Sequence, residues 1–310
     1  MIPTQPAISM KGIAMLLRII AVVFSSVAAI LSTVLPLIFH YSVSNMTIIG
    51  VAFILLMGTL LTHGLLTHTF NDLTDYHSGT DEHSPGVLSG GSRVLQTKTM
   101  SVQSLTKLGI TVSIFLLLMT GLFIFLDYSK FAILTLVGIW GAVSYSLKPF
   151  QLAYYPFIGE WFSLFPTMLL LGVAAPWILL DHIPLWAWQN ALVNAIWCMA
   201  WVMVHHIPDR HADRKAQPVK RTSVVWSEDI FGSQAAKAPA ILYFMFIGIL
   251  AVWIAFTRPL AGIGVGILFI YSVYLTIKMN IDDVDDITKT EKLFLFFAFI
   301  IAIWLGIFVS

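Results

Sequence analysis

Nine long apolar runs, separated by polar connections, restrict what this chain can fold into. A transmembrane helix needs about 20 mostly apolar residues to cross the hydrocarbon core of a bilayer. The runs do not alternate polar and apolar residues as the strands of a transmembrane β-barrel do. The sequence therefore predicts an all-α integral membrane protein with about nine transmembrane helices, near 14–40, 48–70, 104–126, 131–146, 157–180, 185–206, 238–257, 259–278 and 291–309.

The composition agrees with a bilayer environment. Hydrophobic residues make up 58% of the 310 residues and charged residues only 11%, whereas soluble domains carry roughly 25% charged residues. The formal net charge is +1, and nucleic-acid-binding domains are usually strongly basic. We therefore expect membrane lipid, and not nucleic acid, as a partner.

Lysine and arginine are unevenly distributed between the loops, and cytoplasmic loops of membrane proteins carry the excess. If successive helices alternate in direction, only Lys130 and Arg258 of the 17 basic residues fall in the loops of one side. The sequence therefore predicts a multi-pass protein of a bacterial or archaeal cell membrane. Its N-terminus and its long loops are expected in the cytoplasm.

Two of the cytoplasmic connections are long and polar, at 71–103 and 207–237. Long loops in a compact protein are usually functional or disordered. Each of the two opens with spaced aspartates and continues into basic residues. These segments are therefore the expected active-site loops.

Each loop opens with two carboxylates at helical spacing. Asp72 and Asp75 are three residues apart, and Asp209 and Asp213 are four apart. If the preceding helix continues, the members of each pair share one face. His205 lies four residues before Asp209 and belongs to the same stripe. Both helix ends therefore direct carboxylates to one region at the membrane surface.

Carboxylates this close repel each other unless a cation lies between them. Oxygen ligands suit Mg²⁺, which commonly binds one or two carboxylates together with substrate phosphates. Basic residues follow both pairs, namely Arg93, Lys98, Lys215, Lys220 and Arg221. The pattern favours a Mg²⁺-bound diphosphate on a lipid tail, and the alternative is two loops that hold solvated charges of both signs.

Several segments carry a family resemblance. They are Asn71-Asp72-x-x-Asp75 with Ser78-Gly79-x-Asp81, then Gly90-Gly91-Ser92-Arg93-Val94-Leu95, Tyr145-Ser146-x-x-Pro149, Gly159-Glu160, and Asp209-x-x-x-Asp213 with Lys220-Arg221-Thr222. Their order and spacing resemble the UbiA-type intramembrane prenyltransferases over nearly the whole chain. The glycine–arginine segment is most similar to the branch that makes menaquinone-type precursors.

The resemblance implies one transmembrane prenyltransferase-like domain over 1–310, with its helices in a ring around a central cavity. It implies Mg²⁺ bound by Asp72, Asp75, Asp209 and Asp213, with Asp81 as a further candidate ligand. The prenyl diphosphate would be bound by Asn71, Arg93, Lys98, Lys148, Lys220 and Arg221. The prenyl donor would ionise to an allylic cation, which an aromatic or quinone-precursor acceptor would trap.

The chain departs from the resembling family near the acceptor. Ala153 and Tyr154 stand where a basic residue is common, and His205 replaces an asparagine. An imidazole can take a proton near neutral pH, so His205 is a candidate catalytic base; alternatively, it only orients Asp209.

Two other functions stay open at this stage. A terpene cyclase of the same superfamily would use the same cation without an acceptor. A transporter or lipid-binding membrane protein is the alternative of another class, although transport paths usually need ionisable residues within the spans. The acidic run at 282–286 resembles a metal site, but a solvated turn is the favoured interpretation because basic residues flank it.

Overall fold

The computed structural model describes residues 9–85 and 88–309, and this part of the chain contains helices and no strands. Seven helices in it are long and apolar enough to cross a membrane: Ile19–His40, Asn45–Ser78, Val102–Phe125, Glu160–Leu179, Ser233–Ala255, Pro259–Lys278 and Val284–Ile307. The predicted all-α, multi-pass membrane fold is therefore confirmed, whereas the predicted count of nine is not.

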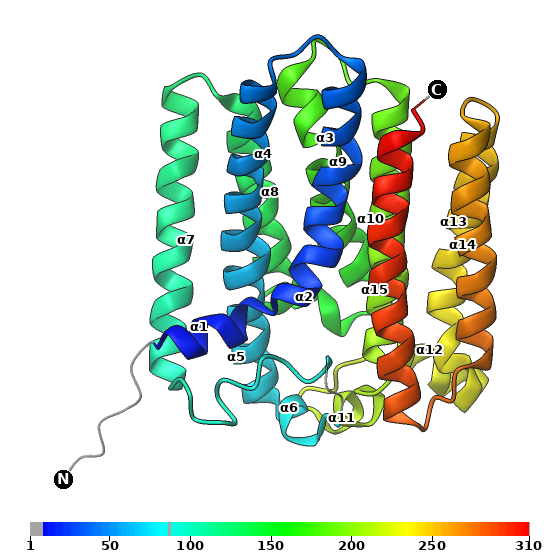
Figure 1. Ribbon diagram of the computed structural model, residues 1–310. Helices are drawn as coiled ribbons and strands as arrows, with labels where there is room; N and C mark the ends of the chain where they lie inside the picture. The colour runs from blue at the N-terminus through cyan, green and yellow to red at the C-terminus, as the bar shows by residue number, and fades with distance from the viewer. Residues whose placement is uncertain (1–8, 86–87, 310) are drawn as a thin grey trace.

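Two further long helices run beside these seven, α8 (Ser129–Ser146) and α10 (Leu185–His206) (Figure 1). Both were predicted as spans, but they are less apolar. Helix α8 carries Lys130 in its first turn, and α10 carries Gln189, Asn190 and Asn194. These amides and this ammonium group lower the mean hydropathy of the two helices.

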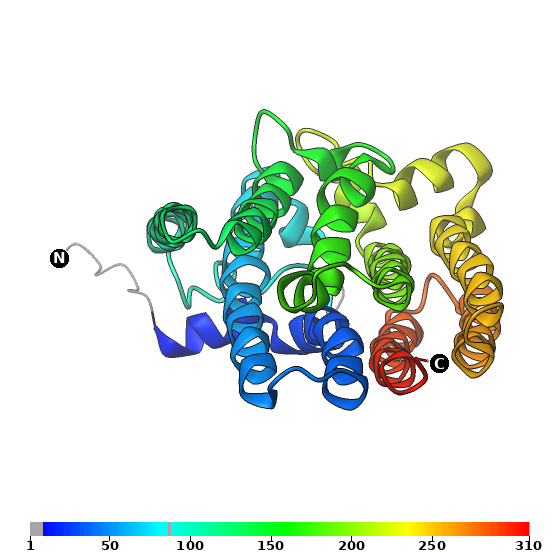
Figure 2. The ribbon, with the colours of Figure 1, turned by 90° about the horizontal axis from the view of Figure 1, so that it is seen from above.

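Neighbouring helices pack side by side in one bundle, in which α3 (Ala28–His40) contacts helices from both halves of the chain. The remaining long segments are α4 (Asn45–Thr59), α7 (Val102–Phe125), α9 (Phe165–Leu179), α13 (Ala238–Ala255), α14 (Pro259–Lys278) and α15 (Val284–Ile307). Helix α3 packs on α4, α7 on α8, and the chain of contacts runs on through α9, α10, α13 and α14. Helix α15 packs against both α14 and α3, and α3 also packs against α9 and α10 (Figure 2).

The first predicted span begins later than its apolar run suggests. Helix α1 (Met10–Leu17) ends at Arg18, whose φ of 42° lies in the left-handed region, and α2 (Ile19–Val22) begins directly after it. Helix α1 lies across the foot of the bundle instead of along it (Figure 1). The prediction of one helix over 14–40 was wrong at its start, because a single left-handed residue redirects the chain.

Three helices contain π-helical turns, at η1 (Val23–Val27), η2 (Leu60–Thr67) and η4 (Glu160–Leu164). Such widened turns occur often at functional sites. Ser26, His63 and Ser163, one polar residue from each turn, are among the residues that line the central cavity. The irregular turns thus bring polar side chains to the interior of an otherwise apolar bundle.

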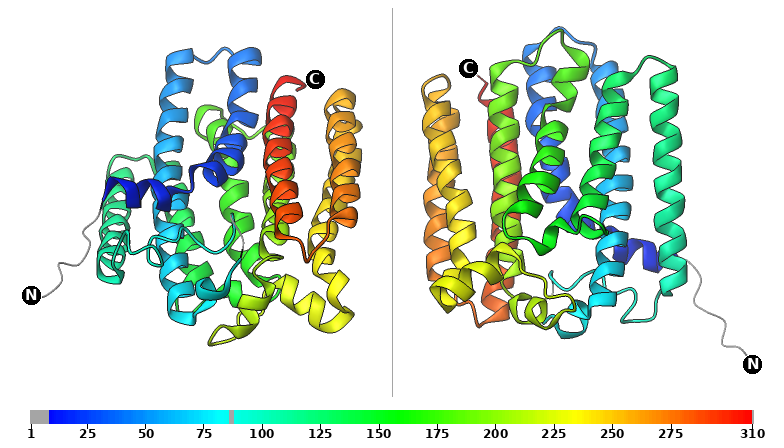
Figure 3. Two further views of the ribbon diagram at one scale, coloured as in Figure 1. Left: turned by 60° about the horizontal axis from the view of Figure 1, so that its bottom comes forward. Right: turned by 180° about the vertical axis from the view of Figure 1, so that it is seen from behind.

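The two predicted loops are partly helical and lie together at one end of the bundle (Figure 3). The first opens with α5 (His68–Ser78) and α6 (Thr80–His83). The second contains α11 (Arg210–Lys215), α12 (Ser223–Phe231) and the 3₁₀ turn η5 (Ser233–Lys237); a further 3₁₀ turn, η3, spans Leu152–Tyr154. We call the end of the bundle that holds the two loops the acidic end. The α7–α8 and α13–α14 turns lie at the opposite end (Figure 1).

Large aromatic side chains fill the interior beside α10. Trp197, Tyr243, Phe244 and Phe294 are almost completely buried between α10, α13 and α15. The outer surface also carries large apolar side chains, such as Leu118 of α7, which is 68% exposed. A soluble protein would hide this surface, so these exposed side chains agree with a membrane fold.

Candidate active site

A cavity of about 570 Å³ opens at the acidic end and extends between α4, η2, α7, α8, α9 and α10. Its polar end is lined by Arg18, Asp75, His205, Asp209 and Lys220. Its deeper walls are apolar and include Leu55, Met57, Leu116, Met119, Phe123, Phe131, Leu134 and Leu171. A long apolar chamber with charged groups at one end suits a molecule with an anionic head and a hydrocarbon tail.

Asp72 and Asp209, from the two predicted signatures, are bound by one segment of the first loop. The Ser92 amide donates to Asp72 Oδ1 over 3.1 Å, and the Ser92 hydroxyl donates to Oδ2. The hydroxyls of Ser84 and Ser89 donate to Asp209 Oδ1, the latter over 2.9 Å. The first loop therefore joins the two acidic helix ends.

A glycine allows this loop to approach the carboxylates closely. Gly91 has a φ of +71°, and a Cβ atom there would lie 2.8 Å from both Asp72 Oδ1 and Asp81 Oδ2. The amide of the preceding Gly90 donates to Asp209 Oδ2 over 3.2 Å. Because only glycine combines this backbone conformation with so small a volume, the Gly-Gly pair is required for the loop's path.

Lys220 joins the other carboxylate of each pair. Its Nζ lies 2.9 Å from both oxygens of Asp75 and 4.0 Å from Asp213 Oδ1. The residue is only 3% exposed. Burial opposes its charge, but the carboxylates of Asp75 and Asp213 raise the pKa of Lys220 well above its usual value. Lys220 therefore carries a fixed positive charge between the two signatures.

Four buried carboxylate oxygens at this end have no hydrogen-bond partner among the described residues: both of Asp213, Oδ1 of Asp81 and Oε2 of Glu228, of which the last forms an ion pair with Arg214. Burial raises the pKa of Asp213 well above its usual value, and the neighbouring Asp209 and Asp75 add to this rise. Burial, with the nearby carboxylates of Asp75 and Asp72, raises the pKa of Asp81 to about 7. Unpaired oxygens in a cluster of this kind are suited to a cation.

Within residues 9–85 and 88–309, no three His, Cys, Asp or Glu side chains form a ready-made metal cage. A structural zinc site would need such a cage. Mg²⁺ differs, because it usually keeps several water ligands and completes its shell with substrate phosphates. The residues present therefore fit a divalent ion that arrives with an anionic substrate.

His205 is held by residues outside both signatures. Its Nδ1 lies 2.8 Å from Glu291 Oε1 of α15, and its Nε2 lies 3.4 Å from Nη2 of Arg18. The ring also stacks on Trp201, with centroids 4.9 Å apart. The structure thus gives no hydrogen bond between His205 and Asp209, and the alternative in which His205 orients Asp209 has no support.

Of the other predicted site residues, two form hydrogen bonds at the acidic end and three lie on the surface. Asn71 Nδ2 donates to Asp75 Oδ2 over 3.0 Å, and Arg93 Nη2 donates to the Ser84 carbonyl over 2.7 Å. Three predicted diphosphate ligands are exposed and are not among the cavity-lining residues: Lys98, Lys148 and Arg221. They were predicted at the site because they are close in sequence to the motifs that carry the resemblance, but their side chains lie on the surface.

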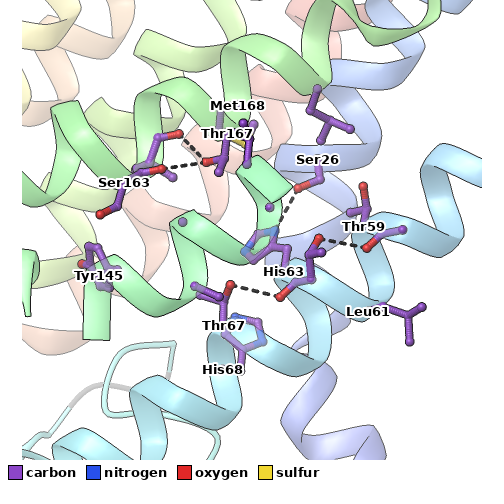
Figure 4. A pocket seen from close by; sticks show the side chains of 18 of the residues that line it. Ser26, Thr59, Leu61, His63, Thr67, His68, Tyr145, Ser163, Thr167 and Met168 are labelled. Carbon is purple, nitrogen blue, oxygen red and sulfur yellow. Dashed lines mark hydrogen bonds between the residues drawn. The ribbon is translucent and has the colours of Figure 1, made fainter. Parts of the chain in front are cut away.

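The polar groups that Figure 4 labels deeper in the cavity are hydroxyls and imidazoles. The Ser26 hydroxyl and His63 Nδ1 lie 2.8 Å apart, and the rings of His63 and His68 are 5.3 Å apart. The Thr167 hydroxyl donates to a backbone carbonyl of its own helix. A cation formed at the polar end would therefore enter a chamber lined mainly by apolar side chains, which exclude the water that would quench it.

A family model described as the UbiA prenyltransferase family matches residues 30–301. The chain belongs to this family. A search of curated proteins gave no match. Among solved structures, the chain is similar to a UbiA homolog from Archaeoglobus fulgidus bound to GPP and Mg²⁺, with a TM-score of 0.63 and 15% identity. The similarity covers 94% of this chain and 99% of that one.

Sequence reasoning missed several residues that this UbiA-family site contains. Arg18 and Glu291 were not assigned to it, although each is an ionisable residue in a predicted span, which is a functional signal by itself. Ser84, Ser89 and Ser92 were also not assigned. Serines are common in loops, and no spacing in the sequence distinguishes those that bind a carboxylate.

The acidic run at 282–286 forms a helix start in this UbiA-family chain. The Asp283 side chain accepts from the amides of Asp285 and Asp286, which caps α15. Asp282 pairs with Arg210 Nη2 at 2.5 Å. Capping and ion pairing explain these aspartates, and the favoured interpretation as a polar turn agrees with this geometry.

Proposed function

We propose that this protein is a Mg²⁺-dependent intramembrane enzyme that moves a prenyl group from a prenyl diphosphate to an aromatic or quinone-precursor acceptor. The observation that carries the proposal is the cavity: an apolar chamber whose polar end is lined by one carboxylate of each pair, Asp75 and Asp209, and by the buried Lys220. Membership of the UbiA prenyltransferase family supports it. The solved homolog, which is bound to GPP and Mg²⁺, supports the choice of donor and ion.

The carboxylates of Asp72, Asp75, Asp209 and Asp213 would hold the ion, with Asp81 as a further ligand. Mg²⁺ supplies positive charge that stabilises the departing diphosphate. Lys220 would contact the diphosphate from the protein side, because it is the buried cation between the pairs. Asn71 orients Asp75, and Arg93 is proposed to contact the diphosphate from the first loop.

The remaining chemistry belongs to the cavity walls and His205. When the prenyl carbon bonds to the acceptor ring, the ring must lose a proton. His205 lines the same cavity as Asp75 and Asp209, and we propose that it takes this proton. The apolar walls exclude water, so the acceptor competes with few other nucleophiles.

The decisive experiment incubates purified protein with Mg²⁺ and a panel of prenyl diphosphates, with and without aromatic acceptors, and identifies products by mass. The expected result is a prenylated acceptor together with diphosphate, both lost when EDTA removes Mg²⁺. If the protein releases no diphosphate and forms no new product with any member of the panel, the whole proposal is contradicted.

A terpene cyclase is the second candidate, and one observation favours it. Tyr154, where the resembling family commonly has a basic residue, packs its ring 5.9 Å from Lys220 Nζ. This position therefore supplies no cation to pair with an acidic acceptor. A cyclised hydrocarbon formed in the absence of any acceptor would establish the cyclase. The transporter alternative is set aside, because the chain belongs to a prenyltransferase family.

We propose that the acidic end faces the cytoplasm. Lys98 and Tyr128 flank the two ends of α7 and are both exposed, while Cys198, the one native cysteine, is buried. Cysteines placed at 98 and 128 should therefore react selectively with a membrane-impermeant maleimide. In intact cells, Tyr128→Cys is expected to be labelled and Lys98→Cys only after permeabilisation. The reverse pattern would invert the proposed topology.

A further inference from the structure

Glu291 is a buried acid that neither signature contains. It lies on α15, two turns after the Asp283 cap, and is 1% exposed. Its carboxylate accepts from His205 Nδ1 at 2.8 Å. An acid buried this deeply is costly unless it is paired. The last helix of the chain therefore supplies a carboxylate directly to an imidazole that lines the cavity.

Arg18 decides how the His205 ring carries its proton. A guanidinium has only donors, so the contact between Arg18 Nη2 and His205 Nε2 at 3.4 Å requires an Nε2 lone pair. A neutral ring with its hydrogen on Nδ1 meets this requirement and also donates to Glu291. A doubly protonated ring would place an N–H against the guanidinium. The two contacts therefore select the neutral ring in which Nε2 carries no hydrogen and accepts from Arg18.

The contact with Arg18 does not block Nε2 permanently. The same Arg18 nitrogen donates to the Leu88 carbonyl, so its longer contact with His205 is the weaker of two. Other charged or titratable groups near the ring are His206, with centroids 6.0 Å apart, and Asp209 and Lys220 of the same cavity. A substrate in the cavity could thus replace Arg18 at Nε2 while Glu291 keeps the ring in place.

We propose that Glu291 is the positioning residue for His205, holding Nδ1 protonated so that Nε2 acts as the proton acceptor. This inference rests on the proposed function. In the step concerned, the bond from the prenyl carbon to the diphosphate oxygen breaks and a bond to the acceptor ring carbon forms. The ring carbon then loses its proton to Nε2, and the C–H electron pair restores the aromatic ring. Glu291 stabilises the imidazolium that results.

Glu291→Gln keeps the shape of the side chain and removes its charge. We expect kcat to fall by roughly 10²-fold, the lower range of what general-base catalysis contributes, while KM for the prenyl diphosphate changes less than about twofold. The acidic limb of the pH profile should move to lower pH, because the lost carboxylate favoured the imidazolium. The double variant with His205→Asn should be no slower than His205→Asn alone, since the two residues act as one unit.

Glu228→Gln is the matched control. Glu228 is a half-buried acid at the acidic end, but it pairs with Arg210 and Arg214 outside the cavity lining. We expect it to change thermal stability without moving the pH profile. If Glu291→Gln leaves kcat and the acidic limb as in the wild type, or if the double variant multiplies the two losses, Glu291 does not position His205.

A measurement without turnover separates this inference from the proposed function. In ¹⁵N-histidine NMR of the substrate-free protein, the signals lost in His205→Asn identify the ring. The wild type should show the neutral ring protonated at Nδ1, and Glu291→Gln should titrate at lower pH. A wild-type ring protonated at Nε2, or an unchanged titration, would overturn the inference even if prenyl transfer is observed. The NMR result stands equally if no prenyl transfer occurs.

Discussion

Asp209→Ala is expected to reduce turnover by about 10³-fold, because a bound metal supplies several kcal/mol of transition-state stabilisation and each 1.36 kcal/mol is tenfold in rate. Asp209 is 7% exposed and lies at the polar end of the cavity. Removing one carboxylate leaves the ion with too few ligands. We expect similar losses for Asp72→Ala, Asp75→Ala and Asp213→Ala, measured as diphosphate release at saturating Mg²⁺.

The Asp209 variant also leaves the donors of Ser84, Ser89 and Gly90 without their acceptor. Thermal stability therefore has to be measured beside activity, and Asp209→Asn serves as the isosteric form that keeps an acceptor oxygen. Asp282→Ala is the control for an acidic residue at the same end that only forms an ion pair. Near-normal turnover in the Asp72 or Asp209 variant would contradict the proposed metal site.

Lys220→Met should weaken binding of the prenyl diphosphate by about 10²-fold, because truncating one partner of a buried charge pair costs at least 2 kcal/mol. The substitution keeps most of the aliphatic chain and removes the ammonium group. Asp75 and Asp213 then face each other without their common cation. We expect a lower melting temperature as well as weaker binding, measured by calorimetry in nanodiscs with Mg²⁺ present.

Arg221→Met is the adjacent control for Lys220→Met. Both residues follow the second signature, yet Lys220 is buried and Arg221 is exposed. Exposed charges contribute little to binding energy at physiological ionic strength. We therefore expect Arg221→Met to bind the prenyl diphosphate nearly as tightly as the wild type does. If the two variants lose the same amount of affinity for the prenyl diphosphate, the loop rearranges around the substrate and Arg221 contacts it, as the sequence predicts.

The sequence by itself determined the features that depend on local spacing. Apolar length predicts membrane helices because the bilayer thickness is fixed, and the all-α membrane fold is confirmed. The spacing of Asp72 to Asp75 and of Asp209 to Asp213 identifies two acidic helix ends. These features could be predicted because they need only one segment of chain at a time.

Tertiary structure alone decided which distant residues meet these carboxylates. Lys220 and Arg221 are neighbours in the sequence, but only the path of the loop places Lys220 between Asp75 and Asp213. His205 and Glu291 are 86 residues apart and touch because α15 packs against α10. Arg18 enters the cavity because one left-handed residue redirects the first helix. Such contacts arise from the packing of whole helices, and no periodicity within one segment encodes them.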